Sequence, residues 1–222
     1  FCSPLVVVIF TVDGSFSAFW DFSVPFGIGA AIYLVEYAKK GSRFVKLIRI
    51  TAETLSGIPS IVYGLFGMLF FVTALHWGMS LLSGALTMVI MVLPLIMRTA
   101  EEALKSVPDS YREASFGLGA GKLRTIFTIV LPSAVPGILA GVILAIGRVI
   151  GETAALIYTA GTVAEVPKNL MGSGRTLALH MYVLSSEGLH MNQASATAVV
   201  ILAFVLVINF LSGAVAKRIA KG

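Results

Sequence analysis

Five long apolar segments constrain the fold of this 222-residue chain more than any other feature of its sequence. They cover about residues 16–37, 58–77, 79–98, 133–160 and 194–216. Each approaches or exceeds the roughly 18 to 20 residues that a helix needs to cross a bilayer core. Because lipid offers no hydrogen bonds to backbone groups, each span is expected to be helical. We therefore predict an all-α, polytopic transmembrane helical bundle surrounded by membrane lipids.

Composition supports this prediction and excludes other classes. Apolar residues make up 57% of the chain and charged residues 12%, about half the charged share of a soluble domain. The single cysteine, Cys2, excludes an intramolecular disulfide and a cysteine-based metal cluster, and the three histidines are not at ligand spacing. In a soluble protein, the net charge of +5 would favour nucleic-acid binding. In this chain the positions of the positive residues instead indicate orientation in the membrane. We expect no metal and no nucleic-acid partner.

The positions of Lys and Arg predict the orientation of the chain. Thirteen of the sixteen follow the first span, follow the third span or end the chain, whereas two lie in the other connections and Arg148 lies within a span. Because positively charged loops stay in the cytoplasm, we expect the loop after the third span and the C-terminus there. The connection at about 161–193 is expected outside, with a short helix lying on the bundle. Residues 1–22 are an uncertain segment, expected to be truncated, and one upstream span would bring the total to six.

A polar stretch between the third and fourth spans, Ser106–Pro132, is the strongest candidate functional segment. Ser106 is expected to cap a short helix, with Asp109 completing a capping box, and Gly119 is among the glycines expected to end it. One face of this helix carries residues at helical spacing, namely Tyr111, Ala114, Ser115 and Leu118. This stripe is too short to build a core, so the helix is expected to dock on another surface.

The spacing within this stretch matches a known pattern. Glu113-Ala114-Ser115, three residues, Gly119, nine residues, Ile129, one residue and Leu131-Pro132 resemble the EAA loop of bacterial ABC importer permeases, with Ser115 as the one departure. In that family the loop, here about 99–131, forms a coupling helix that sits in a groove of a cytoplasmic ATPase. The resemblance implies a type I importer (MetI-like) fold for residues 23–222 and ATPase-coupling roles for Tyr111, Glu113, Ala114, Ser115, Gly119, Leu131 and Pro132. A surface helix without a partner is the alternative.

Polar residues in the fourth span are the candidate substrate path. Arg148 and Glu152 are four residues apart and are predicted to share one helical face, at a depth where charges face the protein interior. With Thr153 they predict a path-lining stretch, because the planar guanidinium of Arg148 suits an oxyanion; a structural ion pair is the alternative. Arg98, at the inner end of the third span, is either a second site or an anchor at the membrane interface. Close helix packing is predicted at Gly137, Gly141, Gly147 and Gly151.

Longer segments narrow the resemblance. The runs at 26–37, 57–67 and 147–153 look like the permease subunits of the phosphate-specific ABC importer, and the run at 152–161 favours the A-type (PstA-like) subunit over its C paralogue. The resemblance implies a complex in the bacterial inner membrane with that paralogue, a cytoplasmic ATPase dimer and an external phosphate-binding protein. It places ATP and Mg on the ATPase, with no cofactor and no catalytic residue in this chain.

Two alternatives remain at this point. One is an importer for another oxyanion, such as phosphonate, molybdate or sulfate, since an external binding protein supplies much of the substrate choice. The other is a self-sufficient channel or secondary transporter. Secondary transporters often show repeated halves and broken helices, and neither is clear in this sequence.

Overall fold

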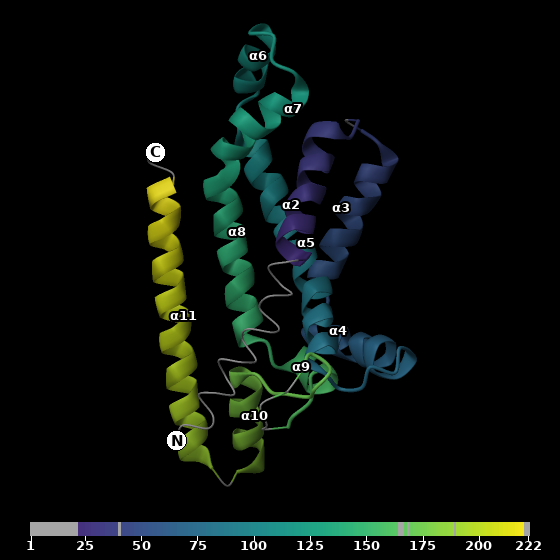
Figure 1. The fold of residues 1–222 in the computed structure, drawn as a ribbon, viewed down its shortest axis with the longest axis vertical. Coiled ribbons are helices and arrows are strands. Elements are labelled where there is room, and N and C mark those ends of the chain that lie inside the picture. The colour runs from purple at the N-terminus through teal and green to yellow at the C-terminus, as the bar shows by residue number, and fades with distance from the viewer. Residues whose placement is uncertain (1–21, 40, 164–166, 168, 189, 220–222) are drawn as a thin grey trace.

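The computed structural model describes residues 22–39, 41–163, 167, 169–188 and 190–219, and every element in them is helical (Figure 1). This confirms the predicted fold class. In chain order the elements are α2 (Val24–Ile32), η2 (Tyr33–Tyr37), α3 (Arg43–Ser56), α4 (Ser60–Gly67), η3 (Met68–Ala74), α5 (Leu81–Ser106), α6 (Asp109–Gly117), α7 (Lys122–Thr125), η4 (Ile126–Val130), α8 (Leu131–Gly151), α9 (Ala154–Thr159), α10 (Leu177–Glu187) and α11 (Met191–Ile219), where η marks a π-helical segment.

Helix α5 is the centre of the bundle. It packs against α2, α3, α4, α8 and α9. Its N-terminus is capped by Ser80, whose Oγ accepts a hydrogen bond from the Ser83 N–H at 3.2 Å. Its fully buried side chains include Met88, Met91 and Ile96, which hold the neighbouring helices by van der Waals packing, because lipid tails are as apolar as these side chains. The other elements therefore take their positions from α5.

Three helices of the described chain are long and apolar enough to cross a membrane: Leu81–Ser106, Lys122–Gly151 and Met191–Leu211. A fourth crossing is possible only as a broken span, because Arg43–Ser56 and Ser60–Ala74 are bent by 101° relative to each other. The span predicted at 58–77 is helical from Ser60 to Ala74, and it qualifies as a crossing only together with Arg43–Ser56. Pro59 explains the bend, since a proline disfavours the helical conformation of the residue before it.

The other predicted spans differ from the structure mainly at their ends. The predicted segment 16–37 lies partly outside the described residues, and its described part is the apolar helix Val24–Tyr37. The third helix continues eight residues past the predicted end at 98, to Ser106. The fourth begins at Lys122 and ends at Gly151, whereas 133–160 was expected. Hydropathy identifies the apolar part of a helix that lies in lipid. It does not identify the polar residues that extend the same helix beyond the lipid.

Glycines set the contact between α5 and α8. A Cβ placed on Gly137 would lie 2.7 Å from the Cβ of Ala103, and one placed on Gly141 would lie 2.6 Å from the Cβ of Thr99. The predicted close packing is confirmed at this pair. It is wrong for Gly147 and Gly151, which have open space beside them in the part of the chain that the structure describes.

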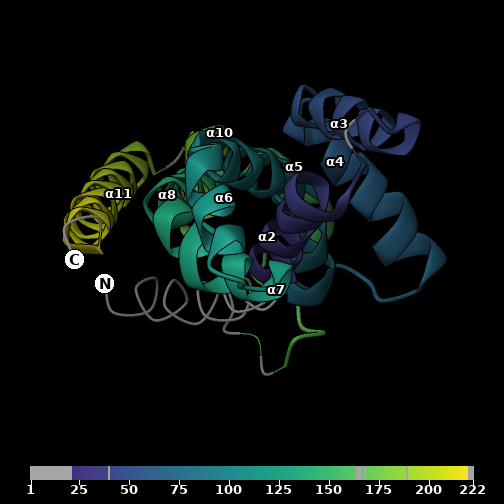
Figure 2. The same cartoon turned by 90° about the horizontal axis from the view of Figure 1, so that it is seen from above.

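The two ends of the bundle carry different elements. Helices α6 and α7 lie at one end, and α9 and α10 lie at the other (Figure 1). The helix expected in the 161–193 connection is confirmed as α10. Figure 2 shows α11 at one edge of the bundle, where it contacts α8 and α10.

Candidate coupling surface and substrate path

Helix α6 begins at Asp109, directly after the turn that ends α5. Ser106 does not cap it. Ser106 is the last residue of α5, and its hydroxyl donates a hydrogen bond to the Ala103 carbonyl at 2.8 Å. The capping-box prediction is therefore wrong, because Pro108 occupies the N-cap position in an extended conformation. The end of the helix is as predicted, since Gly119 has a φ of +80°, which glycine adopts without strain.

One face of α6 is open to a partner. Tyr111 is half exposed and Leu118 is 89% exposed, and Glu113 and Ala114 are exposed beside them. Together with η4, this face forms a groove of about 520 Å³. Ser115 closes its floor, because its hydroxyl is buried and lies 2.8 Å from the Thr125 hydroxyl. An apolar stripe that points away from its own bundle is typical of a docking surface.

The other predicted coupling residues lie at the base of this unit. Leu131 and Pro132 begin α8, where Pro132 occupies a first-turn position that requires no backbone N–H. Leu131 is half buried and Pro132 is exposed. Four of the seven predicted residues line one groove, namely Tyr111, Ala114, Ser115 and Gly119. Glu113 is exposed on the same helix, whereas Leu131 and Pro132 lie at the start of the helix that supports the groove.

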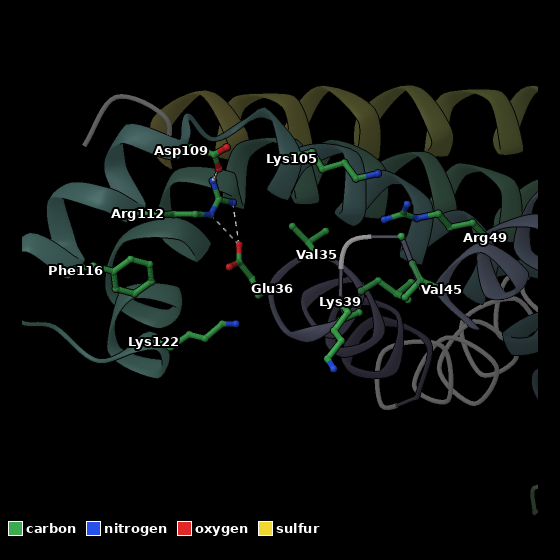
Figure 3. A pocket seen from close by; sticks show the side chains of 13 residues that line it. Val35, Glu36, Lys39, Val45, Arg49, Lys105, Asp109, Arg112, Phe116 and Lys122 are labelled. Carbon is green, nitrogen blue, oxygen red and sulfur yellow. Dashed lines mark hydrogen bonds and ion pairs between the residues drawn. The ribbon is translucent and has the colours of Figure 1, made fainter. Parts of the chain in front are cut away.

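Arg112 fixes α6 to the rest of the bundle (Figure 3). Its Nε and Nη2 donate to Oε1 of Glu36 at 3.0 and 2.8 Å, and the carbonyls of Leu104 and Val107 accept two further bonds at 3.0 and 2.8 Å. The side chains of Arg112 and Glu36 are only 13% and 9% exposed. Arg112 therefore bonds within its own bundle. Glu36 is 76 residues away in the sequence, so helical spacing gave no signal for this pair.

The candidate path residues lie where α8 ends. Arg148 is in the last turn of α8, and Glu152 follows the helix with an extended backbone (ψ 128°). The predicted shared helical face is therefore wrong, because the helix stops between them. Glu152 is buried, and its Oε1 accepts a hydrogen bond from the Ala155 N–H at 3.2 Å, which satisfies the start of α9. Thr153 is the N-cap residue of α9.

Arg98 is neither alone nor at a helix end. Its Nε lies 3.3 Å from Oε1 of Glu102 on the same helix, and its Nη1 lies 3.6 Å from Oε1 of Glu53 on α3. Both contacts are solvent exposed, so each is worth about 0–1 kcal/mol. The structure therefore places Arg98 in a charged contact between α3 and α5, away from Arg148. Among the described residues, no group of three His, Cys, Asp or Glu side chains could hold a metal ion.

The family described as "Binding-protein-dependent transport system inner membrane component" matches residues 23–221. The chain is 38% identical over 180 residues to the "Probable ABC transporter permease protein YqgI" of Bacillus subtilis, covering 75% of this chain and 61% of that protein. It is 42% identical over 139 residues to the "Phosphate transport system permease protein PstA 1" of Mycobacterium tuberculosis, covering 63% of this chain and 44% of that protein. The chain thus spans less than two thirds of these relatives.

Solved structures support the fold. The chain is similar to a chain of the MetNI methionine ABC transporter in an inward facing conformation, with a TM-score of 0.73, 18% identity and coverage of 98% and 94% of the two chains. It is also similar to a chain of a bacterial ABC transporter for alginate, with a TM-score of 0.65, 17% identity and coverage of 96% and 78%. At these identities the likeness concerns the fold alone.

Proposed function

Since the chain belongs to the binding-protein-dependent transport system inner membrane components, the permeases of ABC importers, we propose that it carries inorganic phosphate across the bacterial inner membrane. Relatives with 35–42% identity are named as phosphate transport permeases of the PstA type or their homologues, which supports this substrate. A member of this family is a transport subunit, so ATP hydrolysis belongs to a separate ATPase dimer. The other partners would be a paralogous permease of the C type and an external phosphate-binding protein.

The observation that carries the coupling role is the exposed face of α6 on a firmly attached helix. An element that transmits force needs a surface for the driving partner and a rigid connection to the moving helices. The groove beside Tyr111 and Leu118 offers the first, and the bonds from Arg112 to Glu36 offer the second. Closure of the ATPases would push α6 and shift the packing between two states. In the orientation that the Lys and Arg positions predict, α6 and the C-terminus face the cytoplasm.

The proposed phosphate path passes the end of α8. Arg148 lies within a membrane helix beside the open space at Gly147 and Gly151, where its guanidinium can donate paired hydrogen bonds to an oxyanion. Glu152 would repel phosphate, but its hydrogen bond to the Ala155 N–H turns one carboxylate oxygen toward α9. An importer for another oxyanion is the second candidate, because the name of the Bacillus subtilis relative gives no substrate.

Uptake measurements test both parts of the proposal. Cells that lack the native subunit would receive the full protein or the variant Glu113→Lys, which reverses an exposed charge on the docking face. We expect the full protein to restore phosphate uptake, and the variant to insert in equal amount without restoring it. Lys46→Glu reverses an exposed charge on α3 and is the matched control, expected to retain uptake.

Each failure has a distinct meaning. Normal uptake by Glu113→Lys would contradict the coupling role of this face. Restoration of molybdate or sulfate uptake, but not of phosphate uptake, by the unaltered protein would contradict the substrate and leave the coupling role standing.

A further inference from the structure

A basic cavity of about 530 Å³ lies behind the coupling helix, between η2, α3, α5, α6 and α7 (Figure 3). Two of its lining residues are carboxylates, Glu36 and Asp109. Five are cations, namely Lys39, Arg49, Lys105, Arg112 and Lys122. The cavity is distinct from the docking groove and from the end of α8.

One cation uses both lining carboxylates. Arg112 bonds to Glu36 at 2.8 Å and to Asp109 at 3.2 Å, so this buried group is already neutralised. The two carboxylates have no further cation among the described ion pairs. The remaining four cations must therefore find their counter-charges elsewhere.

Two of the remaining cations share a single further carboxylate. Arg49 and Lys105 lie 2.6 and 2.7 Å from the same Oε1 of the buried Glu101. These contacts lack hydrogen-bond alignment, so their attraction is Coulombic. Lys39 and Lys122 form no ion pair with any described residue. Five cations thus face three carboxylates, and two positive charges stay uncompensated around one cavity.

We propose that this cavity binds a phosphoryl group carrying up to two negative charges, from either free inorganic phosphate or the headgroup of an anionic phospholipid. Its volume is within the range of small-ligand sites, and basic pockets between membrane helices on the cytoplasmic side recognise lipid headgroups. The Lys122 ammonium lies 5.0 Å from the centre of the Tyr37 ring, which places it at the rim beside exposed aromatic surface. The proposal relies on the proposed function only for the side of the membrane that the cavity faces.

A bound phosphoryl group would link separate elements of the coupling unit. Lys122 belongs to α7, Arg49 to α3 and Lys105 to α5, and Figure 3 shows the last two side chains reaching toward each other across the cavity. An anion that contacts all three would brace α6 and α7 against the bundle. Occupancy would therefore stabilise the folded chain, because a ligand that binds only the folded state raises its stability.

The test measures binding to the full chain in nanodiscs of phosphatidylcholine, without the ATPase, the binding protein or transport. One arm adds inorganic phosphate against chloride at equal ionic strength, and the other replaces part of the lipid with phosphatidic acid. The readout is the midpoint of thermal unfolding. We expect one arm to raise it, and that arm identifies the source. The double variant Lys39→Gln/Lys122→Gln should weaken the apparent affinity by about tenfold or more, as expected for lost charge-assisted bonds.

The control removes two charges outside the cavity. Arg43→Gln/Lys46→Gln lies at the start of α3, and both residues are exposed and absent from the lining. This control should keep the affinity of the unaltered chain. No rise in either arm, or an equal loss in both double variants, would overturn the site. Because uptake is not measured, failure of the phosphate transport proposal would be recognised separately.

Discussion

The ion pair between Arg112 on α6 and Glu36 on η2 should contribute strongly to stability. Replacing Arg112 with Gln removes the guanidinium that holds Glu36, while the carbonyls of Leu104 and Val107 lose their charged donors. The carboxylate of Glu36 then stays largely buried without its cation, because its side chain is only 9% exposed. Leaving one partner of a buried pair uncompensated costs about 3–5 kcal/mol.

Substitution of the partner residue, Glu36, completes a double-mutant cycle and separates the effect of charge from the effect of packing. Glu36→Gln keeps an oxygen that can accept from Arg112 and leaves Asp109, 3.2 Å away, as a counter-charge. Its expected cost is about 1.5–3 kcal/mol, the usual value of a hydrogen bond to a charged group. Combining both substitutions removes the unpaired carboxylate. The double variant should therefore be more stable than Arg112→Gln alone.

The measurement is unfolding of the full chain in detergent micelles by increasing fractions of dodecyl sulfate, followed by helical circular dichroism. Glu113→Gln is the control, because this neighbour on α6 is exposed and should change stability by no more than about 0.5 kcal/mol. Two results would refute the reasoning. One is an equal effect of Arg112→Gln and the control, and the other is a double variant less stable than Arg112→Gln.

Three further predictions concern other parts of the bundle. Gly141→Val should destabilise the chain by about 1–3 kcal/mol through overpacking against α5, whereas Gly147→Ala, which enters open space, should be neutral or slightly stabilising in the same unfolding assay. Arg148→Ala should abolish phosphate accumulation while the amount of inserted protein stays normal; unchanged transport would return Arg148 to a structural role. Burial, aided by the nearby Arg175, lowers the pKa of His180. The neutral imidazole is therefore favoured in the folded state, and stability should fall as the pH drops below about 6.5 and through the folded-state pKa. A pH titration of the unfolding midpoint checks this sign, and His180→Gln should flatten that dependence.

Sequence patterns predicted the fold class because burial in lipid leaves the backbone little choice. They predicted α6 for a similar reason, since Tyr111 and Leu118 recur at helical spacing and Gly119 needs a positive φ. They also predicted the groove-facing side of α6. These features depend on residues close together in the chain.

The errors had two sources, namely contacts between residues far apart in the sequence and local interruptions of a helix. Nothing near Arg112 shows that its partner is Glu36, and nothing in the run from Arg148 to Glu152 shows that the helix ends between them. The break depends on α9, whose first turn takes the Glu152 carboxylate as a hydrogen-bond acceptor. Spacing arguments assume a continuous helix, so they fail wherever a helix is interrupted.

The length of the helix that runs from Lys122 to Gly151 has a mechanical consequence. Its thirty residues extend about 45 Å, whereas the hydrocarbon core of a bilayer is about 30 Å thick. If the helix stands upright, about 15 Å of it extends beyond the lipid tails, and the similarly long α5 lies beside it. The two helices form a stiff stalk that carries α6 at its tip, and this stalk would hold the proposed docking face clear of the membrane.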